Sequence, residues 1–513
     1  MKFKKLLFAL TAVFFISCQN DFLEEKPYSF LSAEALYNTD AGAKTQVTGA
    51  WGVISGTYGT SYNLVLDLAS GGWYNTSGAY RETNAFTYTS SSTYMNQNSP
   101  YDGFYRAVVV ANDIISQLPK GKVSQPVKDN VMGQAFLIRG MAYFNMVRMF
   151  GGVPLRLLPV SANDTNLPRA SKEAVYNQII DDLEQAKVLL PLKASQEKGR
   201  PAKYAAYALL GKVYIAMAGA DNSSPFWEKA KTELLAVKTS NEYSLLNKFA
   251  SLWDVSKPNT DESIIEIQFS LLGVESSMSN WYTPRLSSFT PLASNPTFGR
   301  HRPNKESYTF HAARYPNDPR IDATYIYGSY PLLAGGSQNI WPNNKAGQGF
   351  PYMKKYIDPA FIARTTNCNF IYLRYADVLL SLAEAENEIN GPDNAYQYVN
   401  EVLGRARASA SPATTNPANY AGMSKDVFRT RILLERRYEL MGECHLWYDT
   451  RRKGETYLFN FLTEHNNFSV NGGLNLSFDY IYPLDAKFLL LPIPQNEINA
   501  NTEISQSNQN PGY

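Results

Sequence analysis

Cysteine and histidine are scarce in this 513-residue sequence. The three cysteines are Cys18, Cys368 and Cys444, and nothing in the sequence indicates whether the last two form a disulfide. The sequence also lacks the nucleophile elbow, the phosphate-binding loop, the dinucleotide-binding fingerprint and the zinc-protease motif. We therefore predict no catalytic residue, no cofactor and no enzyme activity. No metal site is predicted either, because none of the four histidines has a partner at zinc-ligand spacing: His301, His311, His445 and His465.

Long apolar runs are also missing. Residues 6–16 form an apolar run of 11 residues, whereas a membrane-spanning helix needs about 20. Three lysines precede the run and Ser17-Cys18 follows it, an order typical of a bacterial lipoprotein signal. We predict a signal peptide over residues 1–17, lipidation of Cys18 and a lipidated tether over residues 18–31. The alternative is an ordinary secretory signal with an unmodified Cys18, since Phe15 replaces the usual leucine.

The chain has no large excess of charge of either sign. It contains 48 Lys and Arg against 46 Asp and Glu, and its net charge is +2. Removal of residues 1–17, with three lysines and no acidic residue, leaves −1. A chain so close to neutral lacks the basic surface that nucleic acid requires, so no nucleic-acid partner is predicted. Aromatic residues are abundant, with 35 Tyr, 26 Phe and 7 Trp, and Tyr and Trp suit half-exposed binding surfaces.

Helical periodicity dominates most of the chain. The segment 129–150 is apolar nearly all round, which predicts a helix buried among other helices, and Gly151 and Pro154 follow it as stop signals. Ser171 is a plausible N-cap for a helix that Pro191 ends. Further helices are predicted over residues 32–56, 101–118, 201–218, 371–389, 393–408 and 425–441.

Two segments carry the spacing of a tetratricopeptide repeat. Tyr207-x2-Leu210-Gly211-x2-Tyr214, followed by Ala230-x3-Leu234, resembles one full repeat. A second copy, Leu379-x2-Leu382-Ala383-x2-Glu386 with Ala395-x3-Val399, has Glu386 in place of the aromatic residue. Two unrelated amphipathic hairpins are the alternative. The predicted fold class is mainly α, with tetratricopeptide-like helical hairpins forming a superhelical scaffold beside a second, irregular and loop-rich lobe.

Two regions interrupt the helical pattern. Residues 57–100 are rich in Gly, Ser, Thr, Asn and Tyr and are predicted to be loops. Residues 255–365 are longer and contain many aromatic residues, which argue against disorder and for a functional lobe.

A dense group of charges lies near the C-terminal helices. A functional interpretation would make it an anion-binding or catalytic site. We favour a network of arginine–carboxylate pairs that locks neighbouring segments together, because the charges nearly balance and no nucleophile accompanies them. The group comprises Glu435, Arg436, Arg437, Glu439, Glu443, Asp449, Arg451 and Arg452.

Motifs along most of the chain resemble the SusD/RagB family of nutrient-uptake outer-membrane lipoproteins. They occur in order, and together they are highly specific. They include Cys18 with its acidic tether, Ala135-Phe136-Leu137-x-Arg139, Phe150-Gly151-Gly152-Val153-Pro154, Gly199-Arg200-x-x-Lys203, Asp318-Pro319-Arg320, Leu373-Arg374-Tyr375-Ala376-Asp377, Glu435-Arg436-Arg437-x-Glu439-Leu440, Asp449-x-x-Arg452 and the terminal Gln509-Asn510-Pro511-Gly512-Tyr513.

The resemblance implies one SusD-like domain over residues 32–513. Its parts would be an N-terminal part (32–250), a loop-rich ligand lobe (about 255–365) and a C-terminal helical part (366–513). It implies a surface-exposed protein, lipid-anchored to the cell outer membrane, that captures glycan for a SusC-like TonB-dependent barrel transporter. A peptide-capturing member of the same family and a surface glycoside hydrolase are the alternatives.

Sugar rings present flat C–H faces that stack on aromatic rings, while Asn and Arg hydrogen-bond the hydroxyls. The family's ligand residues lie on variable loops, so we choose candidates from composition alone. The alternative for each is a half-buried side chain that covers the helices. The predicted ligand-binding residues are Trp73, Tyr74, Asn75, Tyr80, Arg81, Trp281, Tyr282, Tyr327, Trp341 and Asn343.

Overall fold

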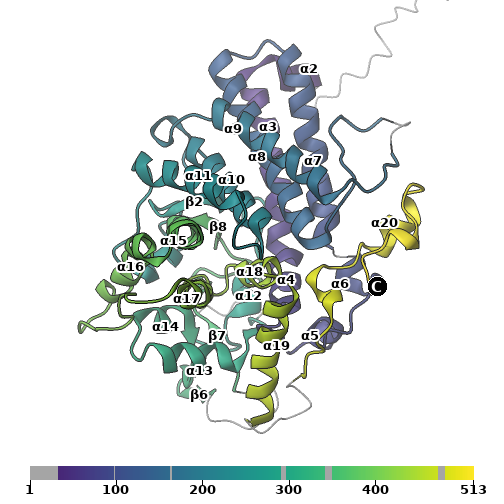
Figure 1. Cartoon of the computed structure of the whole chain (residues 1–513). Coiled ribbons are helices and arrows are strands. Elements are labelled where there is room, and N and C mark those ends of the chain that lie inside the picture. Colours follow the sequence, from purple (N-terminus) through teal and green to yellow (C-terminus); the bar gives the residue numbers. More distant parts are fainter. Residues whose placement is uncertain (1–32, 98, 162–164, 290–295, 341–348, 472–479) are drawn as a thin grey trace, which may run out of the picture.

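The computed structural model describes residues 33–97, 99–161, 165–289, 296–340, 349–471 and 480–513. Long helices dominate these residues (Figure 1) and confirm the predicted mainly α fold. The N-terminal part contains α2 (Ala33–Asn38), α3 (Asp40–Thr57), α4 (Asn63–Ser70), α7 (Pro100–Gln117), α8 (Gln125–Phe150) and α9 (Lys172–Leu189). The other long helices are α10 (Lys203–Ala218), α11 (Phe226–Ser240), α15 (Tyr375–Asn390), α16 (Pro392–Ala408), α17 (Lys425–Glu439) and α19 (Gly454–Asn471).

Several helix ends follow the signals in the sequence. Ser171 caps α9 and its hydroxyl oxygen accepts a hydrogen bond from the Ala174 backbone N–H at 3.1 Å. Helix α8 ends at Phe150, before Gly151 with a φ of 73°. Most of α8 from Val131 onward is buried, as its apolar surface predicts.

Both predicted repeats are helical hairpins. Helices α10 and α11 pack together, and a Cβ added to Gly211 would lie 2.5 Å from Leu234 Cγ, so the glycine permits the close approach. Helices α15 and α16 form the second pair, which contacts the first through α11. Glu386, which occupies the aromatic position of the motif, forms an ion pair with Lys231 of α11, with the Lys231 Nζ and Glu386 Oε2 atoms 2.7 Å apart. The degenerate position therefore joins one hairpin to the next.

Short antiparallel strand pairs lie in and around the loop-rich lobe. They are β1 (Trp73–Asn75) with β3 (His301–Pro303), β2 (Ser263–Ile267) with β8 (Phe370–Arg374), β4 (Tyr325–Ile326) with β7 (Tyr352–Met353), and β5 (Ser329–Pro331) with β6 (Ser337–Asn339). Three shorter helices accompany them: α12 (Met278–Tyr282), α13 (Lys305–Arg314) and α14 (Pro319–Thr324).

Some predicted elements were wrong. Residues 57–70 were predicted as loop but form a π-helical turn, Tyr58–Tyr62, and the buried helix α4. The predicted helix at 371–389 is strand β8 followed by α15, because a short apolar run fits either a strand or a helix. The single helix expected over 32–56 is two helices, with the Thr39 hydroxyl oxygen capping the second.

The charged group near the C-terminal helices is a buried ion-pair network, as predicted, except that Arg451 donates to the backbone carbonyls of Phe488, Ser70 and Ala69 and pairs with no described carboxylate. Arg320 of α14 pairs with Glu435 and Glu439 of α17 at 2.6 and 2.9 Å. Arg374 of β8 pairs with Glu439 at 2.7 Å and with Glu443 at 2.7 Å. The network thereby fastens α14 of the loop-rich lobe to the helical scaffold.

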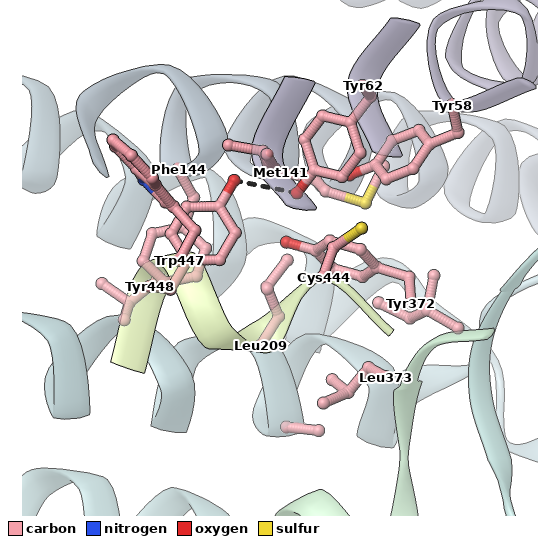
Figure 2. Packing of buried hydrophobic residues seen from close by; sticks show 14 of the residues in the cluster. Tyr58, Tyr62, Met141, Phe144, Leu209, Tyr372, Leu373, Cys444, Trp447 and Tyr448 are labelled. Atoms are coloured by element: carbon pink, nitrogen blue, oxygen red, sulfur yellow. Dashed lines mark hydrogen bonds between the residues drawn. The ribbon is translucent and has the colours of Figure 1, made fainter. Parts of the chain in front are cut away.

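Tyr58, Tyr62, Tyr372 and Tyr448 lie close together in the main core (Figure 2). The hydroxyls of three of them meet at Asn145 of α8. The Tyr62 and Tyr448 hydroxyls each donate to Asn145 Oδ1 at 3.1 Å, and the Asn145 amide donates to the Tyr58 hydroxyl at 3.0 Å. Cys444 lies beside this cluster; it and Cys368 are buried free thiols. The structure therefore answers the open question about these two cysteines: they do not pair.

Candidate functional site

Strands β1 and β3 bring together two loops that are far apart in the sequence. Tyr74 lies opposite Arg302 in the antiparallel pair, and the Thr76 backbone N–H extends it by donating to the Arg300 carbonyl at 3.0 Å. The segment after β1 and the segment before β3 therefore lie side by side. Both are regions in which the sequence analysis placed ligand-binding residues.

Half-exposed aromatic rings gather where these loops meet. Tyr80 stacks on Tyr94 with the ring centroids 4.0 Å apart, and its other neighbour is Trp281, edge-on at 5.9 Å. Trp281 in turn contacts Phe298 edge-on at 5.1 Å. Tyr80 is buried, whereas Tyr94, Trp281 and Phe298 are partly exposed. We call Tyr94, Trp281 and Phe298 the aromatic cluster.

Helix α12 fixes the position of Phe298. The backbone carbonyl of Asn280 accepts hydrogen bonds from the N–H groups of Phe298 and Gly299, at 2.8 and 3.0 Å. Gly299 has a φ of 55°, and a Cβ there would lie 2.7 Å from the Thr283 carbonyl oxygen. The turn therefore requires glycine and holds the Phe298 ring against Trp281.

Two arginine side chains lie beside Phe298 of the aromatic cluster. The guanidinium carbons of Arg300 and Arg364 lie 5.1 and 4.9 Å from the Phe298 ring centroid, within the range of cation–π contact. Arg81, which follows Tyr80, is exposed. The surface therefore combines flat apolar rings with donors suited to hydroxyl or anionic groups.

Five of the predicted ligand-binding residues are buried: Trp73, Tyr74, Asn75, Tyr80 and Tyr282. Trp73 and Tyr282 are each 1% exposed and both pack on His301. Tyr282 donates a hydrogen bond to buried Asp67 at 2.9 Å. Side chains with so little exposed surface cannot stack on a sugar, so we exclude these five from the direct contacts. They belong to the core beneath the loops.

The other candidates have different locations. Trp281 belongs to the aromatic cluster, and Arg81 is an exposed residue that follows Tyr80 in the sequence. Tyr327 is half-buried and stacks on Tyr308, with the ring centroids 3.5 Å apart. Trp341, Asn343 and Cys18 lie outside the described residues, so their predicted roles remain predictions.

Sequence reasoning missed Tyr94, Phe298, Arg300 and Arg364. Tyr94 lies in a Ser- and Thr-rich segment that resembles any surface loop, and Phe298 has no aromatic neighbour in the sequence. The pairing of β1 with β3 and the hydrogen bonds of Asn280 to the Phe298–Gly299 turn bring the two loops together, and no local pattern encodes these contacts. Within the described residues, no group of His, Cys, Asp and Glu side chains could hold a metal ion, and no helix is long and apolar enough to cross a membrane.

Comparison with protein-family models decides the classification. The SusD family model matches residues 262–513, and a second model, "Starch-binding associating with outer membrane", matches residues 21–215. The chain belongs to the SusD family. SusD family proteins are non-catalytic binding proteins, which confirms the expectation that the chain is not an enzyme.

SusD-like relatives align with the whole chain. The SusD-like proteins P25 and P2 of Formosa agariphila are 25% and 28% identical to it, over 100% of both chains in each case. A crystal structure of a SusD homolog from Bacteroides thetaiotaomicron has a TM-score of 0.77 at 23% identity, covering 93% of this chain and 97% of that one. A laminarin-binding SusD-like protein has a TM-score of 0.71 at 23% identity, covering 93% and 100%.

Proposed function

We propose that this SusD family protein captures oligosaccharides on the cell surface and binds them at the aromatic cluster. The observation that carries the proposal is the set of half-exposed rings, Tyr94, Trp281 and Phe298, beside Arg300 and Arg364. Aromatic rings suit the C–H faces of sugars, and the arginines supply hydrogen-bond donors. The solved neighbour described as laminarin-binding gives further support.

The proposal includes how the protein reaches its place of action. A signal peptide over residues 1–17 would direct export, and a lipid on Cys18 would anchor the protein in the outer membrane. From there the protein would deliver its glycan to a SusC-like TonB-dependent barrel transporter. The family description that associates its members with the outer membrane supports this location.

The anchor has a direct test. A Cys18→Ala protein should be lost from the outer-membrane fraction of fractionated cells, because it has no thiol to acylate. Retention of that variant in the outer membrane would show that the lipid is not the anchor.

The binding site is tested by Trp281→Ala, measured by isothermal titration calorimetry against oligosaccharides selected on a glycan array. Loss of a central aromatic contact costs more than about 1 kcal/mol, or about fivefold in affinity. The matched control is Trp253→Ala, because Trp253 is also half-buried but packs on Phe249 outside the cluster. Equal affinity in the parent and Trp281→Ala proteins would contradict the site, and peptide binding without glycan binding would contradict the function.

A further inference from the structure

The segment from helix α12 to strand β8 has an uneven charge, although the whole loop-rich lobe, residues 255–365, carries only +3. Residues 276–376 contain eleven Lys and Arg but only four Asp and Glu, a net charge of +7. The chain from Cys18 onward carries −1 in total, so the rest of it carries −8. The near-neutral composition of the whole protein therefore conceals a basic segment, which lies between the acidic residues Glu275 and Asp377 in the sequence.

Most acidic residues of this segment are buried and already have partners. Glu306 contacts His465 at 2.7 Å, Asp318 pairs with Arg320 at 2.7 Å, and Asp358 accepts a hydrogen bond from Thr366 at 2.5 Å. The fourth, Asp322, is exposed. It lies near Tyr308, whose pKa is raised first by burial and then by the negative charge of Asp322. Tyr308 stacks on Tyr327. None of these carboxylates contacts the aromatic cluster.

The cations divide into a buried and an accessible group. Arg320, Lys355 and Arg374 are buried and paired with carboxylates, chiefly those of Glu435, Glu439 and Glu443. Lys345 lies outside the described residues. The remaining seven are exposed or half-exposed: Arg285, Arg300, Arg302, Lys305, Arg314, Lys354 and Arg364.

Four of the accessible cations lie around the Phe298–Gly299 turn. Arg300 and Arg364 lie over the Phe298 ring, and Arg302 donates from Nε to the Gly299 carbonyl at 2.9 Å. A Cβ added to Gly299 would lie 3.0 Å from the backbone nitrogen of Arg285, so these two segments touch. Arg285 and Arg300 form no ion pair with another described residue, and the Arg300 guanidinium donates to the Ser77 hydroxyl at 3.5 Å.

We propose that the captured glycan is anionic, and that Arg285, Arg300 and Arg364 pair with its sulfate or carboxylate groups while Trp281 and Phe298 stack on its rings. This inference rests on the proposed function. Sugar hydroxyls can accept hydrogen bonds from arginine, but a neutral glycan gains no charge pairing there, whereas the planar fork of a guanidinium matches sulfate and carboxylate oxygens. Sulfate esters and uronates share this chemistry, and the test separates them.

The test measures binding of the purified protein to matched glycans by isothermal titration calorimetry. The probes are sulfated galactan oligosaccharides, the same material after chemical desulfation, oligogalacturonate and neutral laminarin oligosaccharides. We expect an anionic probe to bind at least about tenfold more tightly than the neutral ones, since hydrogen bonds to charged groups are worth that much or more. The preferred anionic probe identifies the group as sulfate or uronate.

The salt dependence gives a second measurement on the same protein. Raising the ionic strength from about 0.1 M to about 1 M shortens the screening length from about 10 Å to about 3 Å. Affinity for the anionic probe should fall several-fold, while affinity for any neutral probe should stay constant.

The variant Arg285→Gln/Arg300→Gln removes two positive charges at the turn. It should lower affinity for the anionic probe about tenfold or more, and lower affinity for a neutral probe by a much smaller factor, because only the anionic probe loses charge-assisted hydrogen bonds. The matched control is Lys44→Gln/Arg106→Gln, which removes two exposed charges from α3 and α7. Equal thermal midpoints for the two variants would show that neither change acts through unfolding.

Each other outcome has a defined meaning. Equal or tighter binding of neutral glycans would overturn this inference and leave the proposed function intact. Absence of binding to any glycan would overturn the proposed function itself. Arginine-dependent binding to vesicles containing anionic lipid, without glycan binding, would assign the basic surface to a membrane and overturn both.

Discussion

Glu439 lies at the centre of the buried network and provides the sharpest test of what joins the lobe to the scaffold. Its Oε1 accepts from Arg374 at 2.7 Å and from Arg405 at 2.5 Å, and its Oε2 accepts from Arg320 at 2.9 Å. Burial raises the pKa of Glu439, but the three arginines more than reverse this and hold it well below its usual range. The carboxylate therefore stays charged at neutral pH.

The variant Glu439→Gln keeps the shape of the side chain and removes its charge. The new amide also directs N–H donors toward guanidinium groups that are donors themselves. Removing one partner from a buried ion pair costs about 3–5 kcal/mol, because the remaining charges stay buried without compensation. We expect a loss of that size in the free energy of unfolding at pH 7.

Urea unfolding followed by circular dichroism measures the loss, because urea does not screen charges. The control is Glu401→Gln: its partner Lys238 lies at 2.8 Å, but the side chains are 39% and 28% exposed. An exposed pair is worth at most about 1 kcal/mol. If the two variants lose the same free energy, the buried network is not what fastens α14 and β8 to α17.

Two further predictions concern the scaffold. Gly211→Val should destabilise the protein by about 1–3 kcal/mol in the same assay, because Leu234 fills the space that a side chain would need. The control is Gly404→Ala on α16, which should be neutral or stabilising, because a Cβ there would meet only the tip of the Arg407 side chain, at 3.8 Å. A Gly211→Val protein as stable as the parent would show that α10 and α11 are not closely packed. Burial lowers the pKa of His445 from 6.5 to about 4 despite nearby Asp377, so acid favours the unfolded chain, which binds the proton first. Stability should therefore fall as the pH drops from 6.5 to 4, by up to about 1.4 kcal/mol per pH unit. The variant His445→Gln should flatten a plot of thermal midpoint against pH over this range. An unchanged slope would show that His445 is not the group whose protonation lowers the stability.

The sequence predicted features that depend on local contacts. The Ser171 cap, the stop at Gly151 and the small residue at Gly211 each act within a turn or a hairpin, so their patterns predict structure directly. The arginine–carboxylate network was also predicted, because so many opposite charges close together in a buried region must pair.

The features that were missed depend on long-range packing. Residues 57–70 have the small and polar composition of a loop. In the structure, however, a Cβ added to Gly59 would lie 2.9 Å from the Glu275 carbonyl oxygen, and distant segments bury α4. Trp73 was predicted to contact a ligand because the segment around it has the composition of a binding loop. A tryptophan in such a segment fits a core strand equally well. In the structure Trp73 pairs with Pro303 in the β1–β3 ribbon and its side chain is buried in the core. Nothing near Trp73 in the sequence specifies that pairing.

The central claim is that the protein binds glycan at the aromatic cluster without cleaving it. One calorimetric titration of the parent protein and of Trp281→Ala with an array-selected oligosaccharide, followed by chromatography of the recovered sugar, tests it most directly. We predict binding by the parent, affinity at least about fivefold lower in the variant, and sugar recovered intact in both. Unchanged affinity in the variant, or shortened sugar after incubation with the parent, would contradict the account.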